Sequence, residues 1–174
     1  MFIIENTTNR YLNYNQVLKS HFGERIQKIS INAGFTCPNR DGSKGIGGCT
    51  YCNNQTFSPE YCTPTKSITQ QIDEGVQFFR KYESQMYLAY FQSYTNTYDA
   101  LDKLTAIYEE ALAHPKVAGI VVGTRPDCVN DELLDYFAAL SKRCYVMIEY
   151  GIESTEDSTL EFINRGHDYA CAIK

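Results

Sequence analysis

The feature that most constrains the fold of this chain is a hydrophobic pattern that switches repeatedly between the period of a strand and that of a helix. Four short apolar runs are each followed by a segment with helical spacing of its apolar residues. The expected strands span residues 25–31, 86–92, 117–122 and 145–148, and the expected helices span residues 14–21, 67–81, 99–113, 130–140 and 158–164. Such alternation predicts an α/β fold with a parallel sheet and right-handed crossovers.

Chain length limits how much of a barrel can form. A closed barrel of eight βα units usually needs about 250 residues, whereas this chain has 174. We therefore expect one domain, residues 1–174, folded as a partial (β/α) barrel with parallel strands. Residues 1–24 are expected to be an N-terminal extension and residues 25–174 to form about four βα units, with the C-terminal part of the barrel absent. Ser67 and Asn130 are the expected N-caps of two helices.

Composition narrows the compartment and the partners. The cysteine count is odd, at seven, and the first residues carry neither a basic segment nor a long apolar one, so we expect a cytosolic protein with reduced thiols. No apolar run reaches the length of a membrane span, so no membrane partner is expected. The net charge of -5 argues against attraction of the whole surface to nucleic acid, although a local basic groove remains open.

Three cysteines lie in one glycine-rich loop directly after the first expected strand. Cys49 and Cys52 are spaced so that both thiolates can reach one metal centre, and Cys37 comes from the start of the same loop. Three cysteines leave one coordination position without a protein thiolate, and an open position is typical of metal centres that carry out chemistry. The glycines let this loop fold tightly, but they match neither template for a phosphate-binding loop.

Taken alone, these residues leave two kinds of metal site open. One is a closed structural zinc site in which Cys62 supplies the fourth ligand. The other is a [4Fe-4S] cluster held at three of its irons, with the fourth iron free for another ligand. The remaining cysteines, Cys128, Cys144 and Cys171, lie in or beside regular elements and are interpreted as small buried hydrophobic residues.

The cysteine loop resembles the cluster loop of an uncharacterised family of radical S-adenosylmethionine (radical SAM) enzymes. The resemblance rests on residues 32–42 (NAGFTCPNRDG) and 47–52 (GGCTYC). It continues through residues 90–98, 124–127 (TRPD) and 163–167 (INRGH), and so covers nearly the whole chain. The last two segments resemble motifs of the elongator catalytic subunit and related radical SAM enzymes. The chain thus looks like the N-terminal part of an incomplete radical SAM barrel.

This resemblance implies an iron–sulfur enzyme. Cys37, Cys49 and Cys52 would bind the [4Fe-4S] cluster, and S-adenosylmethionine would chelate the free iron. An electron from the cluster would cleave the cofactor's sulfonium bond, and the resulting 5′-deoxyadenosyl radical would abstract hydrogen from a substrate. The implied partners are an unknown substrate, RNA or a small molecule, and a reductant protein such as flavodoxin or ferredoxin.

The resemblance also implies which residues meet the cofactor. Gln92 and Thr95 occupy the place of a glycine-rich motif in relatives, a motif that this chain lacks. Glu149 and Glu153 follow the fourth strand, where relatives often carry glutamine in place of Glu153. The candidate cofactor-binding residues are Tyr51, Gln92, Thr95, Arg125, Glu149, Glu153 and Arg165.

Three functions from different classes remain to be separated. The first is the radical SAM enzyme. The second is a zinc-stabilised binding module that presents its surface to protein or RNA. The third is an iron–sulfur electron-transfer protein that does not use S-adenosylmethionine. Arg125 has two readings as well, because it could contact the cofactor or simply pair with a neighbouring carboxylate.

Overall fold

The computed structural model describes residues 10–174, except for the side chains of Gln55 and Phe57, and forms an α/β fold around one parallel sheet. Residues 1–9, which include the start of the expected N-terminal extension, lie outside the described residues. The strands are β1 (Gln27–Ile31), β2 (Tyr87–Phe91), β3 (Val117–Thr124) and β4 (Tyr145–Tyr150), paired in the order β1-β2-β3-β4. The α-helices are α1 (Tyr14–Phe22), α2 (Ile68–Phe79), α3 (Leu101–Leu112), α4 (Asp131–Leu140), α5 (Asp157–Phe162) and α6 (Tyr169–Ile173).

The expected elements are all present, with ends that differ by a few residues. Both expected caps are confirmed: the Ser67 side chain accepts a hydrogen bond from the backbone N–H of Gln70, and the Asn130 side chain accepts one from Leu133. The sequence pattern did not reveal α6 or the two short 3-10 turns, Asn54–Phe57 and Pro126–Cys128. These pieces are too short to establish a hydrophobic period.

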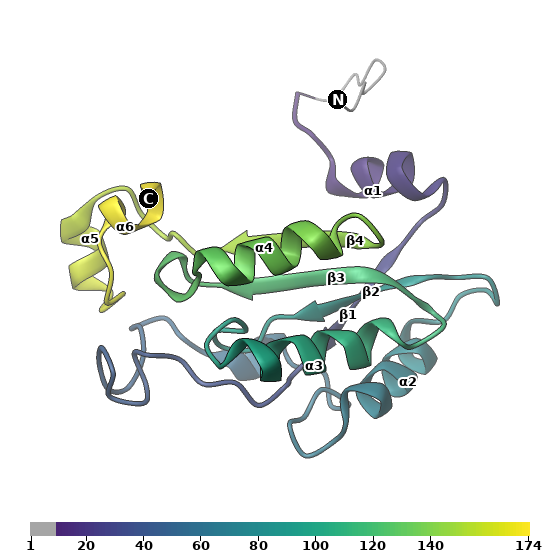
Figure 1. Cartoon of the computed structure of the whole chain (residues 1–174), viewed down its shortest axis with the longest axis horizontal. Helices are drawn as coiled ribbons and strands as arrows, with labels where there is room; N and C mark the ends of the chain where they lie inside the picture. The colour runs from purple at the N-terminus through teal and green to yellow at the C-terminus, as the bar shows by residue number, and fades with distance from the viewer. Residues whose placement is uncertain (1–9) are drawn as a thin grey trace.

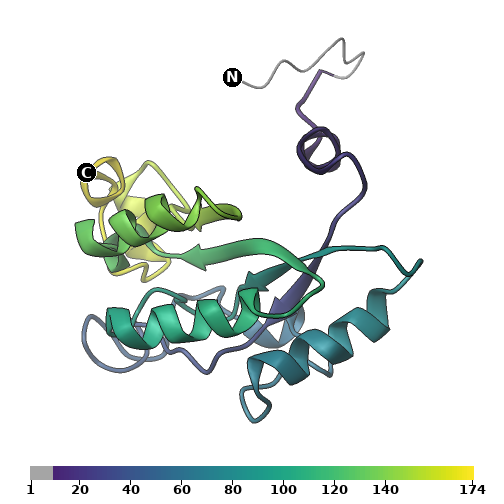
Figure 2. The same cartoon turned by 45° about the vertical axis from the view of Figure 1, so that its right-hand side comes forward.

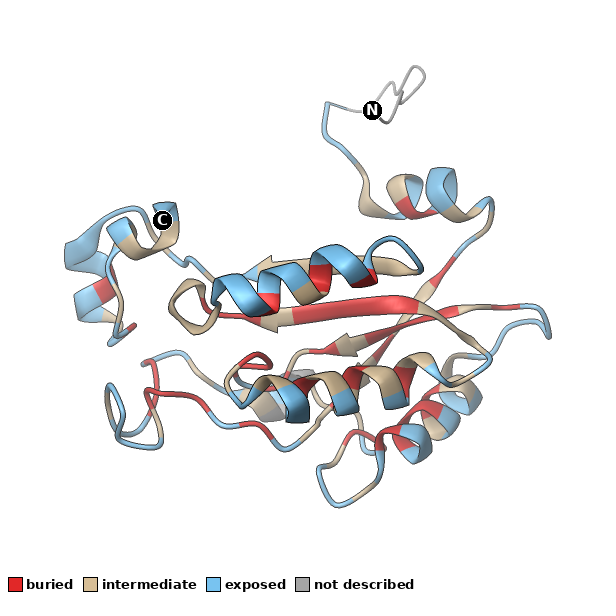
Figure 3. Cartoon of the chain, in the orientation of Figure 1, coloured by how far each residue is buried: buried red, intermediate tan, exposed pale blue. Residues whose placement is uncertain are grey.

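One face of the sheet carries the main hydrophobic core and is covered by α2, α3 and α4 (Figure 1). Figure 3 shows the buried residues concentrated along the strands and on the helix sides that face them. The strands and helices contribute these buried apolar side chains to the core: Ile29, Ile31, Ala89, Phe91, Ile120, Val122, Ile72, Leu104, Tyr108 and Phe137. This face is the outer wall of the partial barrel.

The opposite face packs a second, smaller cluster against α1. Leu18 of α1 meets Leu88 and Val121 of the central strands, and all three are nearly fully buried. Tyr14 and Met147 border the same cluster. Figure 2 shows α1 standing apart from the other helices, on the far side of the sheet from α2 and α3. Helix α1 therefore covers part of the inner wall of the barrel.

All strands point the same way, so the loops that follow them gather at one end of the sheet, beside α5 and α6 (Figure 1). Carboxyl ends of parallel strands are where open α/β sheets bind their ligands. Between residues 10 and 174 there is no helix with both the length and the apolar character of a membrane span.

Candidate functional site

A cavity of about 440 Å³ opens at the carboxyl ends of the four strands. Its walls come from the cysteine loop, from the segments that follow β2, β3 and β4, and from the loop after α5. All the site residues expected from the sequence line it, namely Cys37, Cys49, Cys52, Tyr51, Gln92, Thr95, Arg125, Glu149, Glu153 and Arg165. Five segments that are far apart in the chain thus contribute to a single cavity.

The cysteine loop is shaped by a buried amide, Asn39, which is only 1% exposed. Its Nδ2 donates to the backbone carbonyls of Asn164 and Arg165, at 2.6 and 2.8 Å. The backbone carbonyl of Asn39 accepts a hydrogen bond from the N–H of Gly48 at 2.8 Å. Gly166 must lack a side chain, because a Cβ there would lie 2.2 Å from Oδ1 of Asn39. The loop that carries the cysteines is therefore fastened to the segment after α5.

Two more hydrogen bonds join the same two segments. The side chain of Asn164 donates to the carbonyl of Gly48 at 2.9 Å, and the N–H of Thr50 donates to the carbonyl of Ile163 at 3.0 Å. The residues on either side of Cys49 are thus held by contacts that the local sequence pattern does not reveal. Sequence reasoning noted residues 163–167 as a motif but did not assign them this supporting role.

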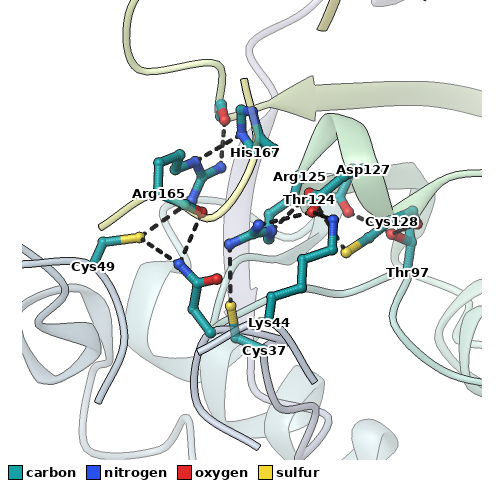
Figure 4. Close-up of polar contacts among 12 residues, drawn as sticks. Cys37, Lys44, Cys49, Thr97, Thr124, Arg125, Asp127, Cys128, Arg165 and His167 are labelled. Atoms are coloured by element: carbon teal, nitrogen blue, oxygen red, sulfur yellow. Dashed lines mark hydrogen bonds and ion pairs between the residues drawn. The ribbon is translucent and has the colours of Figure 1, made fainter. Parts of the chain in front are cut away.

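The three loop thiols face the cavity, and each has a nitrogen donor beside its sulfur. Cys37 Sγ lies 3.8 Å from Nη1 of Arg125, and Cys49 Sγ lies 3.7 Å from Nη1 of Arg165 (Figure 4). Cys52 Sγ lies 3.7 Å from Nδ2 of Asn54. Nitrogen donors of this kind stabilise thiolates and the sulfur ligands of iron–sulfur clusters.

The thiols do not form a closed site for one ion. Sulfurs that share a tetrahedral zinc ion lie about 3.8 Å apart. Within residues 10–174, no three histidine, cysteine or carboxylate side chains converge closely enough to hold a single metal ion. A [4Fe-4S] cube spreads its three ligands around a larger object, and three separate thiols on one cavity wall suit that donor set.

Cys62 does not support the zinc alternative. It is 4% exposed and packs in the main hydrophobic core, and it is not among the residues that line the cavity. Burial raises the pKa of its thiol to about 11. The alternative in which Cys62 supplies a fourth zinc ligand is therefore not supported, because the nine positions between Cys52 and Cys62 carry the chain from the cavity wall into the core.

The other cysteines partly match their expected role. Cys144 packs at the edge of the main core and Cys171 lies half-buried on α6. Cys128 lies half-buried next to Asp127, and burial together with the Asp127 charge raises its pKa to about 12. None of these three lines the cavity.

Arg125 makes the carboxylate pairing that its sequence context allowed, and its contact with a cofactor stays a prediction. It pairs with Asp127 through two hydrogen bonds of 2.8 Å, and it also lines the cavity. Burial acts to lower the pKa of Arg125, but Asp127 outweighs it, so that pKa lies above its usual range. Lys44 of the cysteine loop also pairs with Asp127, and the two cations hold the pKa of Asp127 well below normal despite its burial.

Glu149 lies at the floor of the cavity in a polar cluster that sequence reasoning missed. Its Oε1 accepts from Nζ of Lys28 at 2.6 Å, and its Oε2 accepts from the hydroxyl of Tyr90 at 2.7 Å. The Lys28 ammonium also lies 4.2 Å from the centre of the Tyr90 ring. Burial and this carboxylate raise the pKa of Tyr90. The alternation of side chains in β1 and β2 places Lys28 and Tyr90 on the inner face. This alternation is the sequence signal that could have indicated the polar cluster.

Backbone strain gathers at the same cavity. Among residues 10–174, the non-glycine residues with positive φ are Tyr94 (63°), Glu153 (73°) and Asn164 (55°). Tyr94 and Glu153 line the cavity, and Asn164 supports its cysteine loop. Such conformations are costly for residues with a side chain and cluster at functional sites.

The fold and this cavity place the chain in a known group of proteins. Residues 32–174 match the model of the radical SAM superfamily. The chain therefore belongs to the radical SAM superfamily. Its finer kinship with the elongator catalytic subunit stays a prediction.

Proteins from distant organisms are similar to this chain in sequence. The chain is 38% identical over 174 residues to the uncharacterized protein YtqA of Bacillus subtilis, an alignment that covers 99% of this chain and 54% of that protein. It is 40% identical over 155 residues to the protein YhcC of Escherichia coli K12, covering 88% of this chain and 49% of that protein. It is 34% identical to the uncharacterized protein MJ0486 of Methanocaldococcus jannaschii, covering 94% and 51% of the two chains. The chain thus spans about half the length of these curated relatives.

Proposed function

We propose that this chain is the part of a radical SAM enzyme that binds the iron–sulfur cluster and S-adenosylmethionine. Cys37, Cys49 and Cys52 would hold a [4Fe-4S] cluster, and the cofactor would occupy the rest of the cavity. The observation that carries the proposal is the convergence of ten sequence-predicted residues, from five segments, on one cavity of about 440 Å³. When bound, the reduced cluster supplies the electron that cleaves S-adenosylmethionine to methionine and a 5′-deoxyadenosyl radical.

The chain's own residues would bind and orient the cofactor. Tyr51 leaves 51% of its surface exposed beside Cys52 and offers a flat ring on which a nucleobase can pack. The hydroxyl of Tyr51 is protonated at neutral pH and can donate a hydrogen bond, and burial raises its pKa further. Gln92 and Thr95 supply neutral polar groups on the opposite segment. Their position suits the amino acid part of the cofactor.

Charged residues would fix the remaining polar groups of the cofactor. Glu153 reaches within 3.9 Å of Arg165, so the two offer an acceptor and a donor side by side. Glu149 lies deeper and already bonds Lys28 and Tyr90, which makes its carboxylate a rigid acceptor at the cavity floor. We further propose that a hydrogen atom is removed from RNA or a small molecule, that flavodoxin or ferredoxin supplies the electron, and that the reaction occurs in the cytosol.

The test is anaerobic reconstitution of the chain with iron and sulfide, followed by incubation with S-adenosylmethionine and dithionite. Formation of 5′-deoxyadenosine, measured by liquid chromatography and mass spectrometry, is the expected result, and a reaction without dithionite is the control. A reducible cluster without cofactor cleavage would instead favour the electron-transfer protein. Tight stoichiometric zinc with no iron uptake would favour the binding module and contradict the proposal.

A further inference from the structure

An arginine lies beside each of the three cavity cysteines. The guanidinium of Arg125 contacts Cys37 Sγ, and that of Arg165 contacts Cys49 Sγ, as Figure 4 shows. At Cys52 the neighbour is Arg40, whose Nη2 donates to the Cys52 carbonyl at 3.3 Å. The three arginines come from three different segments and lie beside the three cysteines only in the folded chain.

The first two guanidiniums are buried and held in place. Arg125 is 2% exposed, and its Nε and Nη2 donate to the two carboxylate oxygens of Asp127. Arg165 is 7% exposed, donates to the carbonyl of Gly151, and bonds Nε2 of His167 at 3.0 Å. Because each is anchored away from its sulfur, its remaining N–H groups are oriented toward the cysteine rather than free to rotate into solvent.

Arg40 is more open but is also positioned. Its guanidinium lies 5.3 Å from the ring centre of Tyr94, the tyrosine with the positive φ. On its other side is Gly48, where a Cβ would approach Nε of Arg40 to 2.9 Å. The loop therefore has a glycine where a side chain would displace this cation.

Neutral donors complete the surroundings of two sulfurs. Asn39 Nδ2 lies 3.6 Å from Cys49 Sγ, and Asn54 Nδ2 lies 3.7 Å from Cys52 Sγ. An amide can stabilise a sulfur by a hydrogen bond, but it brings no net charge. The arginines and the asparagines therefore allow the effect of charge to be separated from that of hydrogen bonding.

A reduced cluster carries one more negative charge than an oxidised cluster. Cations a few ångströms from its sulfur ligands, in a site partly shielded from water, favour the reduced form, because charge interactions are strong at short distance and low dielectric constant. We propose that Arg125, Arg165 and Arg40 raise the reduction potential of the cluster, so that a cytosolic electron donor can reduce it. This inference rests on the proposed function, since it requires that the three cysteines hold a cluster.

The burial of the three arginines sets an expected order. Removing the charge of Arg125 or Arg165 should shift the potential most, because both guanidiniums are buried and touch a sulfur. Removing that of Arg40 should shift it less, because water screens a more exposed cation. Asp127 is a positioning residue in this scheme, since it acts through Arg125.

The experiment measures the midpoint potential of the reconstituted cluster by a redox titration monitored by electron paramagnetic resonance. It compares the wild-type chain with Arg125→Gln, Arg165→Gln and Arg40→Gln, and with the three corresponding lysine variants. Arg143→Gln is the matched control, because Arg143 is 55% exposed and pairs with Glu109 on the helix-covered side of the sheet. Iron and sulfide content is measured for every sample.

We expect each glutamine variant to shift the potential to more negative values, each lysine variant to shift it less, and Arg143→Gln to leave it unchanged. If Arg125→Gln does not fold, the comparison rests on Arg125→Lys and on the two other arginines. Unchanged or more positive potentials in Arg165→Gln and Arg40→Gln, at full cluster content, would overturn the inference alone. Failure of the wild-type chain to take up any cluster would overturn the proposed function as well.

Discussion

The two faces of the sheet use the same four strands for different purposes. The face under α2, α3 and α4 is apolar, and side chains such as Ile72 and Phe91 are fully buried there. The inner face carries Lys28, Tyr90 and Glu149, and it continues at the strand ends into the cavity with its thiols and arginines.

This contrast separates stability from chemistry. Burial of apolar area supplies most of the favourable free energy of a fold, so the outer face is expected to decide whether the chain folds. The inner face and the strand ends carry partly buried charges, free thiols and backbone strain, which contribute little to stability and are typical of sites under functional constraint. Mutations on the outer face should therefore lower the stability of the fold, and mutations at the strand ends should lower the metal content with little change in stability.

The largest expected effect is on metal content. Cys49→Ala should reduce the iron bound after anaerobic reconstitution to background, because two thiolates cannot hold the cluster, while the unfolding free energy of the metal-free protein changes by less than about 1 kcal/mol. Iron and sulfide analysis, together with urea unfolding, checks both halves. Cys62→Ala is the control and should keep its iron. Full iron content in Cys49→Ala would contradict the assignment of Cys49 as a ligand of the cluster.

The converse is expected in the core. Ile72 is 0% exposed, and Ile72→Ala should lower the unfolding free energy by about 3 kcal/mol because it removes buried methyl groups and leaves a cavity. Urea denaturation of the metal-free protein measures this, and Gln77→Ala, on the exposed side of the same helix, should change it by less than about 0.5 kcal/mol. If the folded Ile72→Ala protein also bound less iron after reconstitution, the two faces would not have separate roles in stability and metal binding.

A smaller effect is expected at the cavity floor. The Lys28–Glu149 pair is half-buried, with side-chain exposures of 23% and 35%, so its coupling should be about 1 kcal/mol. A double-mutant cycle of Lys28→Met and Glu149→Gln, followed by urea unfolding, isolates that coupling. A value indistinguishable from zero would show that the pair contributes only to the shape and charge of the cavity.

The smallest effect depends on pH. The folded pKa of Cys62, about 11, lies above its ordinary value of 9.0 because of burial. The stability that this shift contributes is fully present below pH 9 and is lost as the pH rises through 11. The stability difference between the wild-type chain and Cys62→Ala should therefore narrow by less than about 1 kcal/mol up to about pH 9.5, which is the first part of the roughly 2.7 kcal/mol that a rise in pKa from 9.0 to about 11 represents. Unfolding midpoints of both proteins, recorded under reducing conditions over this pH range, measure the difference. A stability difference that does not change with pH would contradict the raised pKa of Cys62.

Much of the outer face could be predicted from the sequence because its signals are local. Apolar residues such as Ile68 and Ile72 repeat at helical spacing, and Ser67 marks where that helix begins. The cysteine loop could also be recognised, since its three thiols lie within one short segment. Strand ends were less certain, and β4 extends to Tyr150, two residues beyond its expected end.

The supports of the cavity could not be predicted, because they join residues that are far apart in the chain. Glu149 and Lys28 are separated by 121 positions, and no local pattern indicates that they pair. The same holds for Arg125 and Cys37, which are 88 positions apart. The zinc alternative that included Cys62 lacks support for a related reason. Closeness in sequence to Cys52 suggested a shared site, whereas packing drew Cys62 into the core.

The bonds from Asn39 to the carbonyls of Asn164 and Arg165 span 125 and 126 positions, and they have a consequence for biosynthesis. A ribosome exposes the three cysteines long before it has made the segment that shapes their loop. Until Asn164 and Arg165 have been synthesised, the cysteine loop lacks the hydrogen bonds from Asn39 that hold it in the folded chain. The proposed cluster site is therefore complete only once nearly the whole chain described here has been translated.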